Sequence, residues 1–230
     1  MPTVPDVRPL GDQAFLVRFG TEISPGLHAA VRSTLAALDS DRPAWVVDLV
    51  PAYASVLVVY DPVRVEPDEV AAWLDTRVAA EPAQLPAPRR VTVPVWYDAS
   101  VAPDLEAVAL ERGLTVDEVV ALHTGREYLV YMLGFRPGFP YMGTTDERLA
   151  VERLATPRLA VPAGSVALAG RQTGIYPVAS PGGWRIIGRT PWRLFDPARA
   201  EPFRLLAGDL VRFEAIDERR SHELDEGGGR

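Results

Sequence analysis

The sequence contains no cysteine, no lysine and no asparagine, so all 24 of its basic residues are arginine. Without cysteine there is no disulfide, no thiolate nucleophile, no cysteine-ligated zinc and no iron–sulfur cluster. Without lysine there is no Schiff base and no P-loop, whose lysine reaches the nucleotide phosphates. Without asparagine there is no N-glycosylation acceptor and no Asn-Gly hairpin turn. A biased genome is the simpler origin of these absences, but the excluded chemistries are the same either way.

The remaining composition is that of a globular protein. The 230 residues carry a net charge of −7, with 47% apolar and 24% charged residues. This length suggests one large domain or two small ones. A sequence pI of 5.1 argues against sequence-independent nucleic-acid binding, which needs a basic face. We find no apolar run long enough to cross a membrane and no secretory signal, so we expect a cytoplasmic protein without a membrane partner.

Glycine is unevenly distributed and marks two halves of the chain. Fifteen of the 18 glycines follow residue 112, and the proline-rich segment 81–90 separates the two regimes. Proline favours extended backbone and cannot continue a helix, so this segment is predicted to be a linker. We therefore predict an N-terminal α/β domain over 1–88, a β-barrel domain over 89–217 and a disordered, charged tail over 218–230.

The first half alternates strand and helix patterns. Apolar residues recur at helical spacing after Ser24-Pro25, an N-cap followed by proline at the first helical position. The order β-α-β-β-α suits a split-βαβ, ferredoxin-like fold. Residues 91–97 form a further strand that either pairs back or starts the next domain. The predicted elements are strands at 13–19, 45–50 and 55–60, and helices at 24–39 and 67–78.

The second half begins with helices and then becomes rich in short strands. A helix over 103–112 ends at Gly113, and Thr115 with Glu118 forms a capping box for another. From Glu127 onward, β-branched and aromatic runs are separated by glycine and proline, a pattern typical of an antiparallel barrel. Residues 202–213 predict a hairpin with a Gly-Asp turn.

The most unusual segment is 134–143, GFRPGFPYMG, with three glycines, two prolines and three aromatic residues. It is either a stiff loop pinned to the barrel or a wall of a ligand site. Its arginine, Arg136, could hold a carboxylate bidentately, although a solvated loop arginine is the more ordinary interpretation.

Other polar candidates lie in glycine-rich turns. The run 170–174, GRQTG, offers an amide, a hydroxyl and backbone N–H groups for an anion or amide ligand, or is a plain barrel turn. Trp184 follows another tight turn and suits either core packing or a site. His123 is the one histidine in a predicted core element, where a satisfied structural histidine competes with a functional one. We find no metal-ligand spacing and no G-x-S-x-G nucleophile motif around Ser165.

Taken together, these segments resemble a known family. GFRPGFPYMG, TPRLAVPAGSVALAGRQTGIYPVASPGGWRIIGRTPWRLFDPARAEPF, LLAGDLVRF and the upstream LHTGREYLVYMLGF are similar in order to the allophanate hydrolase subunit 1 family. That family is also known as the Kip-inhibitor family and includes the B subunits of bacterial ATP-dependent 5-oxoprolinases. The resemblance covers about residues 10–213 and is strongest after residue 119.

The resemblance implies a small N-terminal α/β domain followed by a C-terminal cyclophilin-like β-barrel. It further implies an enzyme subunit, inactive alone, that works with two partners of the 5-oxoprolinase, its C subunit (allophanate hydrolase subunit 2-like) and its A subunit. Such complexes cleave the lactam 5-oxoproline to glutamate with ATP as co-substrate, which we expect to carry Mg²⁺. The alternatives implied by the family are inhibition of a sensor histidine kinase and a role in urea or allophanate hydrolysis.

The family resemblance also indicates substrate-binding residues, but it indicates no catalytic residue. We expect the aromatic loop 134–143 to lie where a pocket meets the partner protein, because aromatic residues and arginine are favoured interface anchors. We predict no metal site in this chain. The expected substrate-binding residues are His123, Arg136, Tyr141, Gln172, Thr173 and Tyr176.

Overall fold

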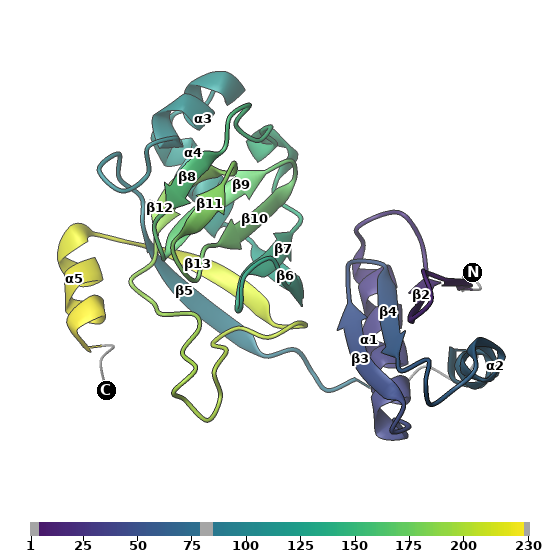
Figure 1. Cartoon of the computed structure of the whole chain (residues 1–230). Helices are drawn as coiled ribbons and strands as arrows, with labels where there is room; N and C mark the ends of the chain where they lie inside the picture. The colour runs from purple at the N-terminus through teal and green to yellow at the C-terminus, as the bar shows by residue number, and fades with distance from the viewer. Residues whose placement is uncertain (1–4, 79–84, 228–230) are drawn as a thin grey trace. The chain divides into compact units, whose positions relative to one another are not determined.

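The computed structural model describes residues 5–78 and 85–227. It divides the chain into two compact units, residues 1–87 and 88–230 (Figure 1). The predicted boundary between residues 88 and 89 lies within one or two residues of this division. Part of the predicted linker, residues 81–84, lies outside the described residues.

The first unit is a four-stranded antiparallel sheet packed against two helices. Helix α1 begins where predicted, because the Ser24 hydroxyl accepts a hydrogen bond from the Leu27 N–H and a proline follows at the first turn. Apolar side chains of the sheet and the helices, including Val17, Val56 and Leu38, form its core. The elements are β1 (Asp6–Pro9), β2 (Ala14–Arg18), α1 (Pro25–Ser40), β3 (Val46–Pro51), β4 (Ser55–Tyr60) and α2 (Pro67–Val78).

The strand order β1-β2-β4-β3 is that of a ferredoxin-like sheet, as predicted, with one difference at its edge. The outer position next to β2 is taken by β1, from the N-terminal side, and not by residues 91–97. Those residues belong to β5 (Arg90–Trp96), which pairs along its whole length with the last strand of the second unit. The sequence pattern left both pairings open, and the structure shows that this strand starts the second unit.

The second unit is a closed barrel with the strand order β10-β7-β6-β13-β5-β12-β9. Its strands are β5, β6 (Glu127–Leu133), β7 (Pro140–Gly143), β9 (Ser165–Ala169), β10 (Gln172–Ile175), β12 (Arg185–Arg189) and β13 (Leu210–Ile216). The short strands β8 (Arg158–Val161) and β11 (Ser180–Gly182) form a separate antiparallel pair outside it. The helices are α3 (Leu105–Arg112), α4 (Val116–Thr124), the 3-10 turn η1 (Glu147–Leu149) and α5 (Glu218–Gly227).

One pair in the barrel departs from the antiparallel prediction. Strand β13 runs parallel to β5 and antiparallel to β6. The predicted hairpin over 202–213 is also wrong, because only its second strand, β13, forms. The turn itself exists: the Asp209 carboxylate accepts a hydrogen bond from the Leu206 N–H at 2.8 Å and pairs with Arg89 at 2.6 Å.

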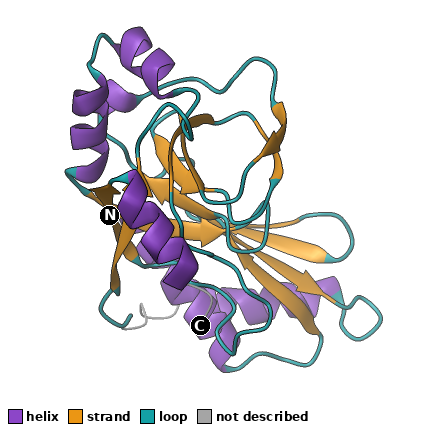
Figure 2. Cartoon of the chain, turned by 90° about the vertical axis from the view of Figure 1, so that its left-hand side faces the viewer, coloured by secondary structure: helices purple, strands orange, loops and turns teal. Residues whose placement is uncertain are grey.

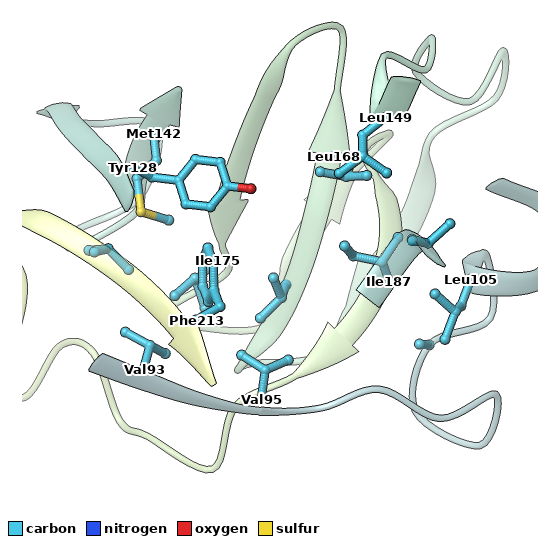
Figure 3. Close-up of a cluster of buried hydrophobic side chains, with 14 of the residues drawn as sticks. Val93, Val95, Leu105, Tyr128, Met142, Leu149, Leu168, Ile175, Ile187 and Phe213 are labelled. Atoms are coloured by element: carbon cyan, nitrogen blue, oxygen red, sulfur yellow. The ribbon is translucent and has the colours of Figure 1, made fainter. Parts of the chain in front are cut away.

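The barrel interior is filled by side chains from every wall. Val93 and Val95 of β5, Met142 of β7, Ile175 of β10 and Phe213 of β13 point toward one another (Figure 3). A filled interior leaves no channel, as expected for a barrel this small. Any ligand site in this unit must therefore lie on its outside or at a rim.

Helices α3 and α4 form where the capping residues predict them. Gly113 has φ +65° and ends α3, while Thr115 and Glu118 make both hydrogen bonds of a capping box at α4. The prediction of a disordered tail is wrong for residues 218–227, because these residues form helix α5. The Asp217 carboxylate accepts from the Arg220 N–H, and Arg219 pairs with Glu223 one turn on.

Figure 2 shows α5 turned toward the viewer, ending at the C label. No helix within the described residues is both long enough and apolar enough to cross a membrane.

Candidate functional site

Strand β10 separates the predicted site residues into two groups. Side chains alternate between the two faces of a strand, so Thr173 and Ile175 point into the barrel core while Gln172 and Gly174 point outward. Thr173 and Ile175 are fully buried, whereas Gln172 is half-buried. Strand β7, paired with β10, repeats this division with Met142 inside and Tyr141 outside.

His123 lies inside the barrel and its ring nitrogens are both satisfied there. Nδ1 is 2.7 Å from the Tyr97 hydroxyl oxygen and Nε2 is 2.9 Å from Oγ1 of Thr173. The ring stacks on Phe213 at 4.3 Å between centroids, and the Tyr128 hydroxyl donates to the His123 carbonyl. Burial lowers the pKa of His123 to about 3, so the imidazole is neutral at ordinary pH.

His123 and Thr173 are placed to support the barrel from inside. Neither side chain has any exposed surface, so in this structure neither is placed to touch a ligand arriving from solvent. Their hydrogen bonds tie α4 to β10 across the barrel interior. The structure brings these two predicted residues together, but apart from the other four.

An aromatic layer covers the outer surface of β9, β10 and β7. Phe139 meets Tyr176 and Trp184 edge-to-face, with ring centroids 5.2 and 5.5 Å apart, which is a favoured aromatic geometry. The layer fits because β10 presents Gly174 beneath it: a Cβ at that position would lie 2.8 Å from Phe139. We call this layer the aromatic face; its members are Phe135, Phe139, Tyr141, Tyr176 and Trp184.

Tyr176 and Tyr141 occupy different depths in the aromatic face. Tyr176 is buried, and its hydroxyl accepts a hydrogen bond from the Trp184 backbone N–H and sits against Gly182, where a Cβ would collide with it. Tyr141 is only half-buried, and burial raises the pKa of its phenol while the nearby Arg153 guanidinium lowers it. Tyr176 therefore forms the floor and Tyr141 part of the accessible rim.

Loop 134–138 stands at the edge of the aromatic face. Phe135 has a φ of +64° and is 57% exposed, yet its ring meets Phe139 at 5.7 Å. A bulky side chain in the left-handed region is strained, and such strain is concentrated at ligand sites. Arg136 is exposed, with its guanidinium 5.7 Å from the Phe135 ring. An open cavity of about 330 Å³ lies between this loop and Phe203.

The structure thus gathers four of the six predicted residues, namely Arg136, Tyr141, Gln172 and Tyr176, on one outer surface. Two further residues belong there that the sequence did not single out as ligand contacts. Phe135 was visible only as part of the loop motif. Arg153, with its guanidinium 5.8 Å from the Trp184 ring, stands in a segment with no motif at all.

Two buried carboxylates of this unit have structural partners. Asp104 is buried and pairs with Arg158, and Asp209 is buried and pairs with Arg89, so both hold the fold together. Within the part of the chain that the structure describes, no three His, Cys, Asp or Glu residues converge to hold a metal ion. What the aromatic face offers is an apolar surface with guanidinium, phenol and amide groups at its rim, suited to a small anionic or amide ligand.

The sequence model of a protein family, the carboxyltransferase domain, subdomain C and D, matches residues 5–205 of this chain. The chain belongs to this family. It is 38% identical over 231 residues to the B subunit of the 5-oxoprolinase of Bacillus subtilis, covering 96% of each chain. It is 46% identical over 141 residues to the B subunit of the 5-oxoprolinase of Escherichia coli O157:H7, covering 61% of this chain and 63% of that one. These names agree with the sequence resemblance and indicate a component of a 5-oxoprolinase complex.

Solved structures share the fold. TTHA0988 matches with a TM-score of 0.79 and 39% identity, covering 92% of this chain but only 40% of the longer one. The uncharacterized protein PH0987 of Pyrococcus horikoshii matches with a TM-score of 0.56 and 45% identity over 94% of this chain and 99% of that one. The urea carboxylase of Kluyveromyces lactis has a TM-score of 0.79 at 18% identity over 97% of this chain and 23% of that one, which shows the fold alone.

Proposed function

We propose that this chain is the B subunit of an ATP-dependent, cytoplasmic 5-oxoprolinase that acts with the C and A subunits of that enzyme. The observation that carries the proposal is the 38% identity to the B subunit of the Bacillus subtilis 5-oxoprolinase over 96% of both chains. An alignment that spans both units of the chain supports the same role more strongly than a shared barrel would.

The chemistry explains the requirement for ATP. Resonance makes a lactam carbonyl a poor electrophile. Transfer of the γ-phosphoryl group to the lactam oxygen releases ADP and produces an imidate-like carbon. Water adds to that carbon, the ring C–N bond breaks, and the nitrogen takes up a proton as an amine. A second water then hydrolyses the resulting acyl phosphate, so 5-oxoproline, ATP and two waters yield glutamate, ADP and phosphate.

The aromatic face offers groups that suit the lactam. In our proposal the Arg136 guanidinium pairs with the 5-oxoproline carboxylate, since a planar guanidinium matches a carboxylate bidentately. The Tyr141 hydroxyl and the Gln172 amide hydrogen-bond the ring amide, and the Phe135 ring packs on the ring methylenes. Tyr176 supports Phe135 from below, with ring centroids 6.5 Å apart.

The phosphates and the metal need other contacts. Because the chain has no lysine, any contact that it makes with the triphosphate of the co-substrate comes from arginines and backbone N–H groups, or else the partner subunit binds the triphosphate. Mg²⁺ is commonly held by the substrate phosphates with one or two carboxylates and several waters. We accordingly propose that Mg²⁺ arrives bound to ATP, which is consistent with the lack of a three-ligand cluster among residues 5–78 and 85–227.

The exposed rim of the aromatic face suits contact with a partner protein. Phe135 is a large apolar side chain held in a strained, exposed conformation, and an aromatic residue next to an arginine is typical of an interface anchor. The matching region makes up only 40% of TTHA0988, so in that protein it is joined to other sequence. We propose that the rim is covered by the C subunit, which completes the site.

The test is reconstitution. The chain is co-expressed with its neighbouring subunits, and ATP-dependent glutamate formation from 5-oxoproline is measured by chromatography, with urea as the comparison substrate. We expect glutamate from the complete complex, none when any one component is omitted, and no ATP turnover with urea. No glutamate from a complete, assembled complex contradicts the proposal, and turnover of urea in its place redirects it to the urea and allophanate branch.

A further inference from the structure

A second cavity of the barrel unit lies apart from the aromatic face. It has a volume of about 590 Å³ and shares no lining residue with that face. Its walls come from the loops at one end of the barrel, from the segment following β12, and from helix α5, the yellow helix of Figure 1. A volume of this size is typical of a site for a small molecule or a cofactor.

Two arginines and one acidic residue, Asp225, line this cavity. No hydrogen bond or ion pair joins the Arg189 guanidinium to another described residue, and its side chain is exposed. Arg193 pairs with Asp196 at 3.3 Å, but its side chain remains 69% exposed, and an exposed pair of this kind is weak. Both guanidinium groups are therefore available for an anion, and bidentate pairing with phosphate is what guanidinium groups favour.

Two tryptophans line the same cavity. Trp96 and Trp192 are half-buried. The Arg204 guanidinium lies 3.7 Å from the Trp192 ring centroid without lining the cavity, so it holds that ring from outside. Indole rings are the largest stacking surfaces among the side chains, and a nucleobase that stacks on an aromatic side chain binds more tightly. One cavity thus combines stacking surfaces with phosphate-binding groups.

Helix α5 forms an adjustable wall of this cavity. None of its described residues is buried, and it contributes Ser221, His222 and Asp225 to the lining. The His222 ring lies 6.3 Å from that of Trp96. In Figure 2 this helix lies on the outer side of the unit, facing the viewer. A helix with so little buried surface can shift to admit a ligand at small cost.

We propose that this cavity binds a purine nucleoside triphosphate, with the base against Trp96 and Trp192 and the phosphates at Arg189 and Arg193. The inference rests on the proposed function, for which it locates the ATP co-substrate in this chain, separate from the lactam at the aromatic face. In this proposal the lactam and the γ-phosphoryl group of ATP meet only in the assembled complex. The two surfaces that hold them share no lining residue.

The test uses the full-length chain without partners. Quenching of tryptophan fluorescence and calorimetry report binding of ATP, of adenosine and of inorganic triphosphate. We expect saturable ATP binding that is tighter than binding of either fragment, because the two parts of the cavity contribute separately. No saturable binding at millimolar ATP overturns the inference.

Variants assign the binding to this cavity. Arg189→Gln should weaken ATP about tenfold or more, the value of one charge-assisted hydrogen-bonded pair, and Trp192→Phe should weaken adenosine more than triphosphate. Arg212→Gln, which removes the same charge from an exposed position on β13 outside the cavity, should leave ATP affinity unchanged. An unfolding midpoint equal to that of the wild type establishes that each variant is folded. The inference is overturned if Arg189→Gln and Arg212→Gln weaken ATP binding equally, or if neither variant weakens it.

The reconstituted complex separates this inference from the proposed function. If the complex forms glutamate but Arg189→Gln leaves the KM for ATP unchanged, the cavity assignment fails and the function stands. If ATP binds here and Arg189→Gln abolishes that binding, while no glutamate forms from a complete complex, the cavity assignment stands and the function fails.

Discussion

The two faces of strand β10 show how adjacent residues of one motif take different roles. On the inner face, Thr173 and His123 satisfy each other in a sealed core. On the outer face, Gly174 makes room for Phe139 while Gln172 stays half-buried at the rim. A resemblance in sequence marks all these positions alike, whereas burial separates those that hold the barrel from those that can meet a ligand.

The largest effect is expected on the inner face. His123→Ala removes a fully buried ring and leaves the Tyr97 and Thr173 hydroxyls without their partner. We expect the free energy of unfolding to fall by about 3–5 kcal/mol, the usual cost of such a cavity. Guanidinium unfolding followed by tryptophan fluorescence measures it, with His222→Ala on exposed α5 as the matched control. A loss below about 1 kcal/mol would contradict the structural role of His123.

A methyl group on the outer face should also destabilise the barrel, by a different route. In Gly174→Ala the new Cβ would lie 2.8 Å from Phe139 and 3.1 Å from the Pro140 carbonyl oxygen, so the aromatic layer must move. We expect a loss of about 1–3 kcal/mol from overpacking, read as a lower unfolding midpoint. Gly26→Ala, where a Cβ meets open space, is the control. A neutral Gly174→Ala would mean that the aromatic face is loosely packed.

Acid should weaken the inner face through His123, in addition to its effect on His28 of the first unit, whose pKa burial lowers to about 4. The pKa of His123 is about 3 in the folded protein against an ordinary value of 6.5, so below pH 6.5 the unfolded chain binds a proton that the folded chain does not. Stability therefore falls as pH falls from about 6.5 toward 3, by about 1.4 kcal/mol for each pH unit. Unfolding measured at pH 6.5 and pH 5 should show this slope, reduced in His123→Gln. An unchanged slope in that variant would place the titration elsewhere.

The smallest change in stability is expected at the rim. Arg136→Ala removes an exposed side chain, so the unfolding midpoint should stay within about 0.5 kcal/mol of the wild type. In the assembled complex the same variant should raise the KM for 5-oxoproline about tenfold or more, the effect of losing one charged hydrogen-bonded pair. Steady-state kinetics and co-purification measure both effects. A variant with normal assembly and normal kinetics would remove Arg136 from the site.

Local signals in the sequence predicted the elements well. Ser24, Thr115 and Gly113 end or begin helices through contacts within a few residues, and such contacts are readable from neighbours in the chain. The parallel neighbour of β5 was not readable, because that choice depends on a strand more than a hundred residues away. Helix α5 was missed because its support comes from ion pairs and capping on a strongly polar segment.

For the candidate site, the resemblance named six residues, and the structure divides them by burial. The resemblance named Arg136, Tyr141, Gln172 and Tyr176, which the fold gathers on one surface. It also named His123, whose enclosure depends on Phe213 and Tyr128 packing around it. Arg153 could not be found from sequence, since only the fold brings it to Trp184.

The parallel pairing of β5 with β13 has a consequence for synthesis of the chain. The barrel's first strand, at Arg90–Trp96, borders its last, at Leu210–Ile216, so the wall cannot close until the segment through Ile216 has left the ribosome. Until then β5 and β6 present unpaired edges, which are sites of aggregation. A nascent chain of this protein, or one truncated before Leu210, should therefore depend on chaperones far more than the finished barrel does.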